Sequence, residues 1–409
     1  MAKEYKDLVV GLDIGTAKVM AVVAEVLPDG ELRVAGLGIA SAHGLKRGVV
    51  VNIDATVQSI QQALKEAEMM ADCKITRVYT GITGSHIRGQ NSTGMVIVRD
   101  KEVTPVDVTR VVETAKAINI PNDQRLLLVE PQEFVIDGHE VKEPIGMSGG
   151  RLEVKVHIVT GAQSAAENII KCVRRCGLEV DQLVLNPSAS SHAVLTEDEK
   201  DLGVALVDIG AGTTDIAIFT DGAIRHTAVI PIAGDLITSD IAMALRTPTK
   251  DAEEIKVEYG VAKQLLADPS EQLEVPGLGD RAPRMLSRQA LAGVIEPRVE
   301  EIFSLVHQVI RDSGYEELLS SGIVLTGGAA VMPGMVELGE DIFLKPVRKG
   351  IPTYHGSLHD MVANPRSATV MGLLEEARLG RARGIKAAQQ AGSVKTLFGR
   401  AKDWFLGNF

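Results

Sequence analysis

Two segments of the chain repeat one pattern, and this repeat constrains the fold more than any other feature. An apolar β-branched run leads into an Asp-Ile-Gly turn, small polar residues follow, and a second apolar run comes next. Such a pattern predicts a β-hairpin. It occupies residues 8–26 and again residues 203–222, and the two turns begin at Asp13 and Asp208, 195 positions apart. We therefore expect two similar halves that arose by duplication.

The rest of the sequence alternates strand and helix patterns, which is typical of α/β proteins. Between residues 85 and 162 this rhythm gives way to β-rich segments around one short helix, which has Pro105 in its first turn. We expect this stretch to form a small α+β subdomain inserted into the first half. With 409 residues, the chain is long enough for two or three domains.

Charge and cysteine content exclude several classes of protein. The 43 Lys and Arg against 54 Asp and Glu give a net charge of −11, which disfavours nucleic acid as a partner. Three cysteines cannot form a disulfide framework in a chain of this size, so we expect a reducing compartment. No apolar run reaches the roughly 18 residues that span a bilayer, so any membrane association should be peripheral.

The two Asp-Ile-Gly turns carry the residue types that a nucleoside triphosphate with magnesium requires. Backbone N–H groups of glycine-rich turns hold phosphates, and carboxylates hold the hydrated metal. The candidates are Asp13, Gly15, Thr16, Ala17 and Lys18 in the first turn, and Asp208, Gly210, Ala211, Gly212, Thr213, Thr214 and Asp215 in the second. A single turn of this kind is most often only a turn. Two matched hairpins and a strand-ended Thr-Gly-Gly turn at residues 326–328 together predict a nucleotide cleft.

These motifs resemble those of the actin, Hsp70 and sugar-kinase superfamily, and within it those of the FtsA family of bacterial cell-division proteins. GLDIGTAKV is similar to the first phosphate loop, LVDIGAGTTDIA to the second, and GIVLTGGAAVMPG to the adenosine motif. LNPSASSHAVL and PRSATVMGLL resemble the two connecting helices of the superfamily. The resemblance to FtsA covers nearly the whole chain, through GITGSHIRGQNSTG, IGMSGGRLEVKVHIVTG and the amphipathic C-terminus.

The resemblance implies an α/β, actin-like (ribonuclease H-like) fold, in which duplicated domains flank a nucleotide cleft and carry the inserted small α+β subdomain. The expected division is a first domain over residues 1–84 and 163–200, the insert over 85–162, a second domain over 201–362 and a returning connecting helix over 363–377. A flexible basic linker over 378–392 and an amphipathic helix over 393–409 follow from the local composition.

The resemblance also implies roles for individual residues. It places Asp13 and Asp208 on magnesium through water, and residues 210–214 on the β- and γ-phosphates. Glu253 and Lys256 are expected near ribose and adenine, although an exposed helix pair explains them equally well. The remaining expected contacts are Gly234 near phosphate and Gly327, Gly328 and Ala329 against the adenosine.

One departure from the superfamily bears on the chemistry. Some relatives keep a Glu that orients the attacking water just before the proline of the first connecting helix, whereas Asn186 precedes Pro187 here. An amide cannot accept a proton as a general base, so we expect ATP binding with weak or incidental hydrolysis.

The C-terminal segment has the features of a membrane-surface helix. The expected membrane-binding residues are an apolar stripe at helical spacing and the cations beside it. The stripe is Val394, Leu397, Phe398, Ala401, Trp404 and Phe405, and the cations are Lys395, Arg400 and Lys402. A helix of this length is only about 25 Å long and is charged, so it suits the bilayer interface. Residues 378–409 carry a net charge of +6 against −17 on the rest, which favours an anionic leaflet. A terminal helix docked on the protein's own core is the alternative.

The resemblance therefore implies an ATP- and Mg²⁺-binding cell-division protein that polymerises on the cytoplasmic face of the cell membrane at the division site. It implies that the chain tethers the C-terminal tail of the tubulin-like protein FtsZ, associates with itself and recruits later division proteins. Anionic membrane lipids are the further expected partner. Two alternatives remain at this point: a sugar or metabolite kinase on the same fold, and another membrane-associated actin-like scaffold, of the rod-shape or pilus-assembly kind.

Overall fold

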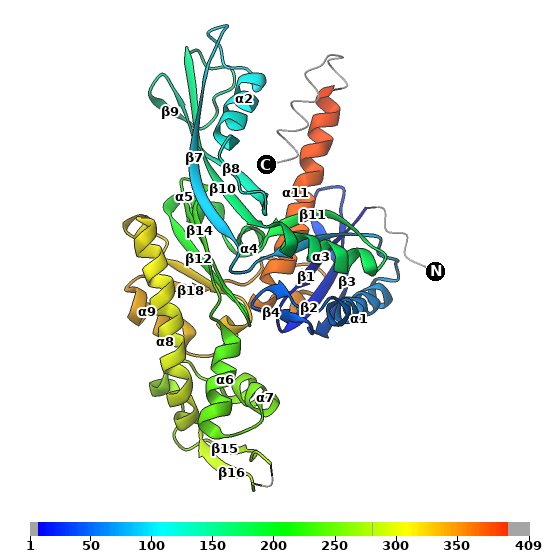
Figure 1. Cartoon of the computed structure of the whole chain (residues 1–409), viewed down its shortest axis with the longest axis vertical. Coiled ribbons are helices and arrows are strands. Elements are labelled where there is room, and N and C mark those ends of the chain that lie inside the picture. Colours follow the sequence, from blue (N-terminus) through cyan, green and yellow to red (C-terminus); the bar gives the residue numbers. More distant parts are fainter. Residues whose placement is uncertain (1–6, 280, 392–409) are drawn as a thin grey trace.

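The two halves of the chain are built on five-stranded sheets that have the same strand order when one of them is read from its opposite edge. The computed structural model describes residues 7–279 and 281–391, and Figure 1 shows its arrangement. The first sheet has the order β11-β6-β1-β2-β3. Its strands are β1 (Leu8–Ile14), β2 (Lys18–Val26), β3 (Leu32–Ser41), β6 (Arg77–Ile82) and β11 (Glu179–Leu185). The second sheet has the order β14-β13-β12-β17-β18. Its strands are β12 (Val204–Ile209), β13 (Thr214–Thr220), β14 (Ala223–Ile230), β17 (Ile323–Thr326) and β18 (Val347–Lys349).

Pairing within the sheets repeats as well. In each half the predicted hairpin, β1–β2 or β12–β13, is antiparallel, and its first strand pairs in parallel with a later strand, β6 or β17. The hairpin strands are almost wholly buried, because both faces of each sheet are covered by other elements. The structure therefore confirms the expected duplication.

Helices cover the sheets on their outer faces and fill the space between them. The helices of the first half are α1 (Ile53–Ala71), α3 (Gln163–Arg175) and α4 (Asn186–Val194). Those that follow are α5 (Glu197–Leu202), α6 (Gly234–Leu245), α7 (Thr249–Tyr259), α8 (Arg288–Ser313), α9 (Met335–Phe343), α10 (His359–Val362) and α11 (Ala368–Ala391). Two small ribbons pair β4 (Leu45–Lys46) with β5 (Val49–Val50) and β15 (Gln272–Val275) with β16 (Arg284–Ser287). None of the helices in the described part of the chain is both long and apolar enough to cross a bilayer.

The two connecting helices, α4 and α11, lie between the sheets and join the halves. A hydrophobic core shared by both halves includes Val22 of β2, Leu206 of β12 and Ala217 of β13, packed with Leu374 of α11. The outer faces have separate cores, one under α1 and α3 and one under α6 and α8. The two Asp-Ile-Gly turns at the ends of the hairpins therefore lie on elements whose positions are set by one continuous apolar contact.

The inserted subdomain is a four-stranded sheet covered by one helix. Its elements are β7 (Arg88–Ile97), α2 (Pro105–Lys116), β8 (Gln124–Ile136), β9 (His139–Val141) and β10 (Arg151–Ala162), with strand order β7-β10-β8-β9. Thr104 and Asp107 form a reciprocal capping box at the start of α2, and Val108, Val111 and Val112 bury its apolar face on the sheet. The α+β character expected for this insert is confirmed.

The predicted boundary at residue 378 is wrong. Helix α11 starts at Ala368 and continues unbroken to Ala391, so residues 378–391 belong to the returning helix and not to a flexible linker. Alanine, arginine, lysine and glutamine dominate this stretch, and their high helix propensity outweighs Gly380 and Gly384. Arg378 pairs with Glu375 one turn earlier, and Arg381 pairs with Asp7 at the start of the first sheet. The predicted membrane-binding residues, 394–405, lie outside the described residues.

The close packing of the connecting helices generates a test. A Cβ at Gly372 of α11 would lie 1.8 Å from the carbonyl oxygen of Ala189 in α4, so Gly372→Ala must push the helices apart. We expect it to lower the free energy of unfolding by about 1–3 kcal/mol or more, as overpacking does. Denaturant titration measures this. Gly380→Ala in the same helix is the control, because its Cβ would have 3.9 Å to Tyr79, and it should be neutral or slightly stabilising. Equal destabilisation by both would contradict the packing.

Candidate nucleotide site

The two predicted phosphate turns have the same local geometry. In the first, the Gly15 N–H donates to the Lys18 carbonyl at 2.9 Å, and in the second the Gly210 N–H donates to the Thr213 carbonyl at 2.9 Å. Each bond closes the hairpin, so the intervening residues project from the ends of their strands. Neither turn forms the start of a helix, in agreement with the absence of a Walker or Rossmann motif.

The turns meet face to face. A Cβ at Gly212 would lie 2.5 Å from Oγ1 of Thr16 in the first turn and 2.8 Å from Cα of Arg47, which follows β4 with φ = 50°. The Thr16 hydroxyl accepts the N–H of Gly48 at 3.1 Å and so fixes the short β4–β5 loop beside the turn. Residues from positions far apart in the chain thus converge, and only glycine fits at position 212.

The Thr-Gly-Gly turn after β17 closes the site from the second half. Gly327 has φ = +88°, and a Cβ there would lie 2.4 Å from Oδ1 of Asp208 and 2.5 Å from the carbonyl of Ile209. Its N–H donates to the Pro365 carbonyl at 3.2 Å, which ties the turn to the segment before α11. Gly328 is open to the solvent-facing side, with a Cβ position 4.0 Å from Arg366. The predicted adenosine motif therefore adjoins the second phosphate turn.

Gly234, at the start of α6, joins the same cluster. Its N–H donates to the Gly210 carbonyl at 3.1 Å, and the next N–H, that of Asp235, donates to Ala211 at 2.8 Å. A Cβ at Gly234 would also come within 3.8 Å of the Ala329 side chain, which links it to the adenosine motif. The structure thus brings the predicted glycines of three separate motifs together.

Glu253 and Lys256 of α7 lie beside this cluster. The Lys256 ammonium donates to the Gly234 carbonyl at 3.2 Å, to Thr238 at 2.8 Å and to Glu253 at 2.6 Å. The Lys256 side chain is only 12% exposed, whereas that of Glu253 is 45% exposed. The pair is therefore more than an exposed helix pair, since Lys256 binds the backbone at the start of α6.

Three carboxyl groups are buried around the junction of the turns, and burial raises the pKa of each. For Asp13 the nearby Lys18 ammonium, 3.8 Å away, opposes this rise in pKa. Asp208 accepts hydrogen bonds from Ser190 of α4 at 2.7 Å and Thr369 of α11 at 3.3 Å. These bonds lower its pKa, while desolvation and the Asp13 charge raise it. Desolvation, followed by the charge of Asp208, raises the pKa of Asp215 to about 7.

A hydrogen bond crosses from one half to the other at Asp215. The hydroxyl of Thr83, which follows β6, donates to one Asp215 oxygen, and Thr213 donates to the other at 3.0 Å. Lys18 also connects distant segments, since its ammonium donates to the Arg366 carbonyl at 2.5 Å. Burial lowers the pKa of this ammonium, which makes an anionic ligand a favourable neighbour.

The donor set fits a hydrated magnesium ion better than a metal held by protein alone. Within residues 7–279 and 281–391, no three His, Cys, Asp or Glu side chains form a group able to hold a metal. Asp13 and Asp208, desolvated and set on opposing turns, leave most of the six Mg²⁺ positions to water and phosphate oxygens. The residues therefore fit a metal that arrives with a nucleotide.

The amide oxygen of Asn186 does not face the buried carboxyl groups at the junction of the turns. A Cβ at Gly81 of β6 would lie 2.2 Å from Asn186 Oδ1, and that oxygen is buried with no hydrogen-bond partner among the described residues. The amide thus packs against the end of β6.

Sequence reasoning missed the hydroxyl donors of the site, Thr83, Ser190 and Thr369, and the carbonyl of Arg366. A single serine or threonine has no distinguishing pattern. The one usable signal was the density of serines in NPSASSHAVL, which is unusual for a buried helix.

Comparison with known proteins identifies the family. The family model "Cell division protein FtsA" matches residues 205–372, and the model of the SHS2 domain inserted in FtsA matches residues 84–160. FtsA of Pseudomonas aeruginosa is 56% identical over 98% of each chain, and that of Neisseria meningitidis is 51% identical over 97% of this chain and 98% of its own. FtsA of Escherichia coli is 45% identical over 99% of each. The chain belongs to the FtsA family.

Solved structures agree on the actin-like fold. The type IV pilus PilM–PilN complex has a chain with a TM-score of 0.65 at 18% identity, covering 92% of this chain and 99% of that one. MreB5 of Spiroplasma citri bound to ADP has a TM-score of 0.57 at 15% identity, covering 94% and 99%. Family and fold together make this an actin-like cell-division protein with an SHS2 insert, as the resemblance predicted.

Burial of Asp215 predicts a pH dependence of stability. Its pKa of about 7 exceeds the unfolded value of 3.8, so the unfolded chain loses this proton first and stability falls as pH rises between those values. Asp215→Asn removes this loss, because its neutral amide keeps one oxygen that accepts a hydroxyl of Thr83 or Thr213 and an NH₂ group that donates to the other hydroxyl oxygen. Without nucleotide, its advantage in unfolding free energy should grow from pH 4.5 to 7, by about 2–4 kcal/mol, and then level off. Urea titration measures it, with exposed Asp100→Asn as control. A difference in unfolding free energy between variant and wild type that does not change with pH would contradict the raised pKa of Asp215.

Proposed function

We propose that the junction of the two turns binds ATP with Mg²⁺ and that the nucleotide controls assembly of this cell-division protein on the membrane. The observation that carries the proposal is the opposition of the two acid-and-glycine turns, which meet where Gly212 packs on Thr16. Desolvated carboxylates and open glycine backbone on both sides suit a ligand that combines phosphates with a cation. That MreB5 of Spiroplasma citri has been solved with ADP supports the same use of the fold.

Each part of the cleft then has a task. Gly15 and Gly210 close the two turns with their own N–H groups, the backbone N–H groups of residues 16–17 and 211–214 hold the β- and γ-phosphates, and Lys18 adds a positive charge. Asp13 and Asp208 orient the water shell of the magnesium ion, which, when bound, neutralises phosphate charge. Gly327, Gly328 and Ala329 bring backbone close to the adenosine, and Lys256 positions Gly234. Asn186 cannot serve as a general base, so turnover should be slow and the nucleotide should act mainly as a conformational ligand.

The membrane and partner roles rest on the family and on the sequence of the C-terminus. The cationic, aromatic segment over 393–409 is our proposed anchor to anionic lipids on the cytoplasmic face of the cell membrane. Helix α11, which ends at Ala391, runs away from the second half (Figure 1). We propose that the anchored chain forms filaments, binds the C-terminal tail of FtsZ at the division site and recruits later division proteins. The MamK double helical filament, with a TM-score of 0.53, illustrates filament formation by this fold.

Calorimetry tests the nucleotide site. Asp208→Ala removes one metal-orienting carboxylate and the acceptor that the Ser190 and Thr369 hydroxyls share, so MgATP affinity should fall at least tenfold, or by about 1.4 kcal/mol. Asp13→Ala should act in the same direction. Asp100→Ala, a truncation of an exposed acid on the insert, should bind as the wild type does. Undiminished MgATP binding by both cleft variants, with both folded, would rule the site out.

Vesicle flotation tests the anchor. The full chain should float with vesicles that contain anionic lipid, whereas a chain ending at Gly392 should remain in the lower fraction. Added salt should weaken flotation, because part of the attraction is electrostatic. Neutral vesicles are the control for the charge contribution. Equal flotation of the full and truncated chains would remove the C-terminal anchor from the proposal.

A further inference from the structure

The inserted subdomain is part of the first half in the sequence but also lies against the second half in space. Its strands β7, β8 and β10 contact β14, the edge strand of the second sheet. Figure 1 shows the insert standing over the end of that sheet. The contact surface is polar, and its residues on the insert are Asn91, Gln132, Glu133 and His157, while those on β14 are Ile224, Arg225 and Thr227. We call it the insert–β14 contact.

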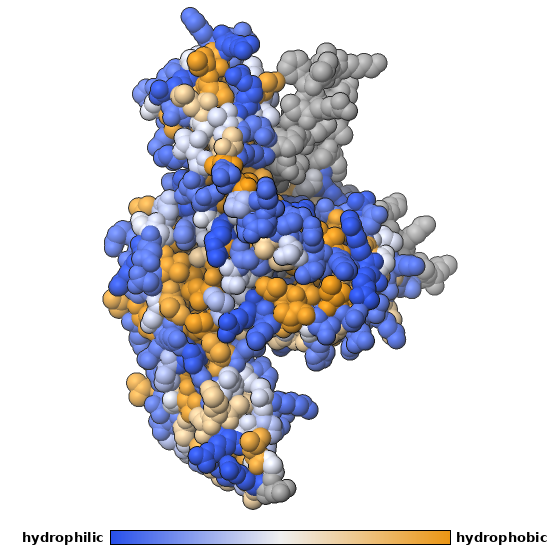
Figure 2. Space-filling model, in the orientation of Figure 1, coloured by the Kyte–Doolittle hydropathy of each residue, from blue (hydrophilic) through white to orange (hydrophobic). Residues whose placement is uncertain are grey.

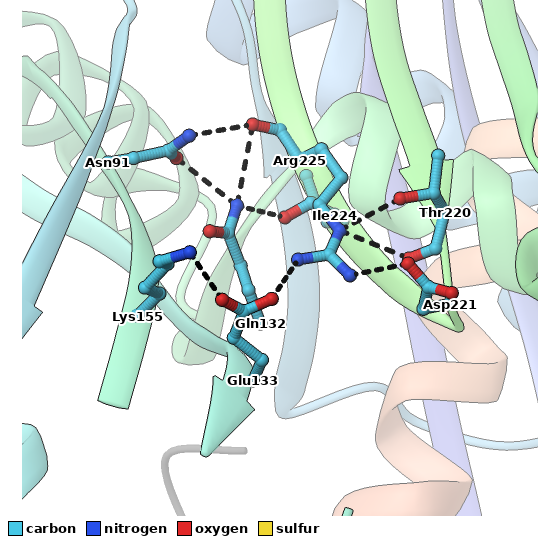
Figure 3. A network of polar contacts seen from close by, with 8 residues as sticks. All are labelled: Asn91, Gln132, Glu133, Lys155, Thr220, Asp221, Ile224 and Arg225. Carbon is cyan, nitrogen blue, oxygen red and sulfur yellow. Dashed lines mark hydrogen bonds and ion pairs between the residues drawn. The ribbon is translucent and has the colours of Figure 1, made fainter. Parts of the chain in front are cut away.

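Side-chain amides of the insert cap main-chain carbonyls of β14 (Figure 3). The Gln132 amide donates to the carbonyl of Ile224 at 2.9 Å, and the Asn91 amide donates to that of Arg225 at 3.2 Å. Gln132 also donates to Asn91 Oδ1 at 3.2 Å, so the two amides hold each other in place. An edge strand presents unpaired carbonyls. Here the insert satisfies two of them.

Arg225 contributes the charged part of the contact. Its guanidinium is held within the second half by Thr220, at 2.9 Å, and by Asp221, at 2.8 Å. Its remaining nitrogen reaches Glu133 of the insert at 3.5 Å, and Glu133 pairs on its other side with Lys155 at 2.5 Å. The Arg225 residue is only 7% exposed, so little water screens this pair.

His157 makes the third link. Its Nδ1 lies 2.6 Å from Asn91 Oδ1, and its Nε2 lies 2.9 Å from the Thr227 hydroxyl. Because the Asn91 nitrogen faces a carbonyl, its oxygen faces the ring, so Nδ1 donates and Nε2 accepts. Burial lowers the pKa of His157 to about 4, which keeps the ring neutral. A Cβ at Gly89 would lie 2.5 Å from the Thr227 hydroxyl, so β7 and β14 approach as closely as glycine allows.

The same strand leads from this contact to the candidate nucleotide site. Val229 of β14 pairs with Asp215 of β13, and Thr214 of the second turn donates to the Ile232 carbonyl just beyond β14 at 2.8 Å. The other attachment of the insert also reaches the cleft, because Thr83, which donates to Asp215, immediately precedes it. The insert is thus joined to the site at two points, one on each half.

We propose that the insert–β14 contact couples the candidate nucleotide site to the inserted subdomain, so that nucleotide binding changes how firmly the insert is held on the second half, and a firmly held insert in turn favours nucleotide binding by the same factor. Ligands that bind between two domains commonly move one domain relative to the other. Because the insert bridges both halves, such a movement must either carry the insert along or break its contact with β14. The inference rests on the proposed nucleotide site.

Hydrogen–deuterium exchange of the full chain tests the coupling. In the wild type, saturating MgATP should slow exchange in β7, β8 and β10, which do not line the cleft. In the wild type this slowing should be about fivefold or more, the low end of typical coupling factors, whereas the double variant Asn91→Ala, Gln132→Ala should still bind MgATP but lose the slowing in the insert. Gln90→Ala, an amide truncation at an exposed neighbouring position of β7, is the matched control and should behave as the wild type.

A second variant tests the contact by a different route. Gly89→Ala wedges β7 away from Thr227 without removing a hydrogen-bonding group, and it should also uncouple the insert from MgATP. Calorimetry on the same samples separates the two proposals. Absence of MgATP binding by the wild type would overturn the nucleotide site and the coupling with it. Normal MgATP binding, with no change in the insert of the wild type or an equal change in the folded variants, would overturn the coupling alone.

Discussion

The burial of carboxylates where the two hairpin turns meet is the constraint on which the rest of the structure depends. Removing Asp13, Asp208 and Asp215 from water raises the pKa of each carboxyl group. The free-energy cost of burying the charged form is reduced only where a cation or a hydroxyl donor lies close. The fold supplies Lys18 from β2, Thr83 and Thr213 from turns beside strand ends, and Ser190 and Thr369 from the connecting helices. The proposed magnesium-bound triphosphate would bring a further cation to these carboxylates.

The same helices that supply those hydroxyls also join the halves. Apolar side chains of both sheets pack on α4 and α11, and Gly372 lets the two helices approach to backbone contact. On the face of the molecule seen in Figure 2, apolar areas lie among polar ones over the second half and over part of the first half. The insert adds a third connection between the halves, made of polar groups instead of apolar ones. Polar contacts exchange with water more readily than a packed core does. We therefore expect ligand binding to alter this polar connection before it alters the apolar one.

Prediction from the sequence succeeded where the signal is local. The two hairpins and their glycine turns were identified, because periodicity and turn chemistry depend on neighbouring residues. It failed at residues 378–391, where small and basic residues without an apolar stripe were taken for a linker although their helix propensity is high. The membrane-binding role of 394–405 stays a prediction.

The sequence by itself determined the two hairpins, their acid-and-glycine turns and the family to which the chain belongs, since each of these is written in contiguous residues. Only the tertiary structure decided that Gly212 meets Thr16, that Ser190 and Thr369 share Asp208, and that the insert rests on β14. These contacts join residues that are more than 90 positions apart, except for that of Ser190. Their partners are chosen by the packing of whole sheets and helices, and no local pattern encodes that choice.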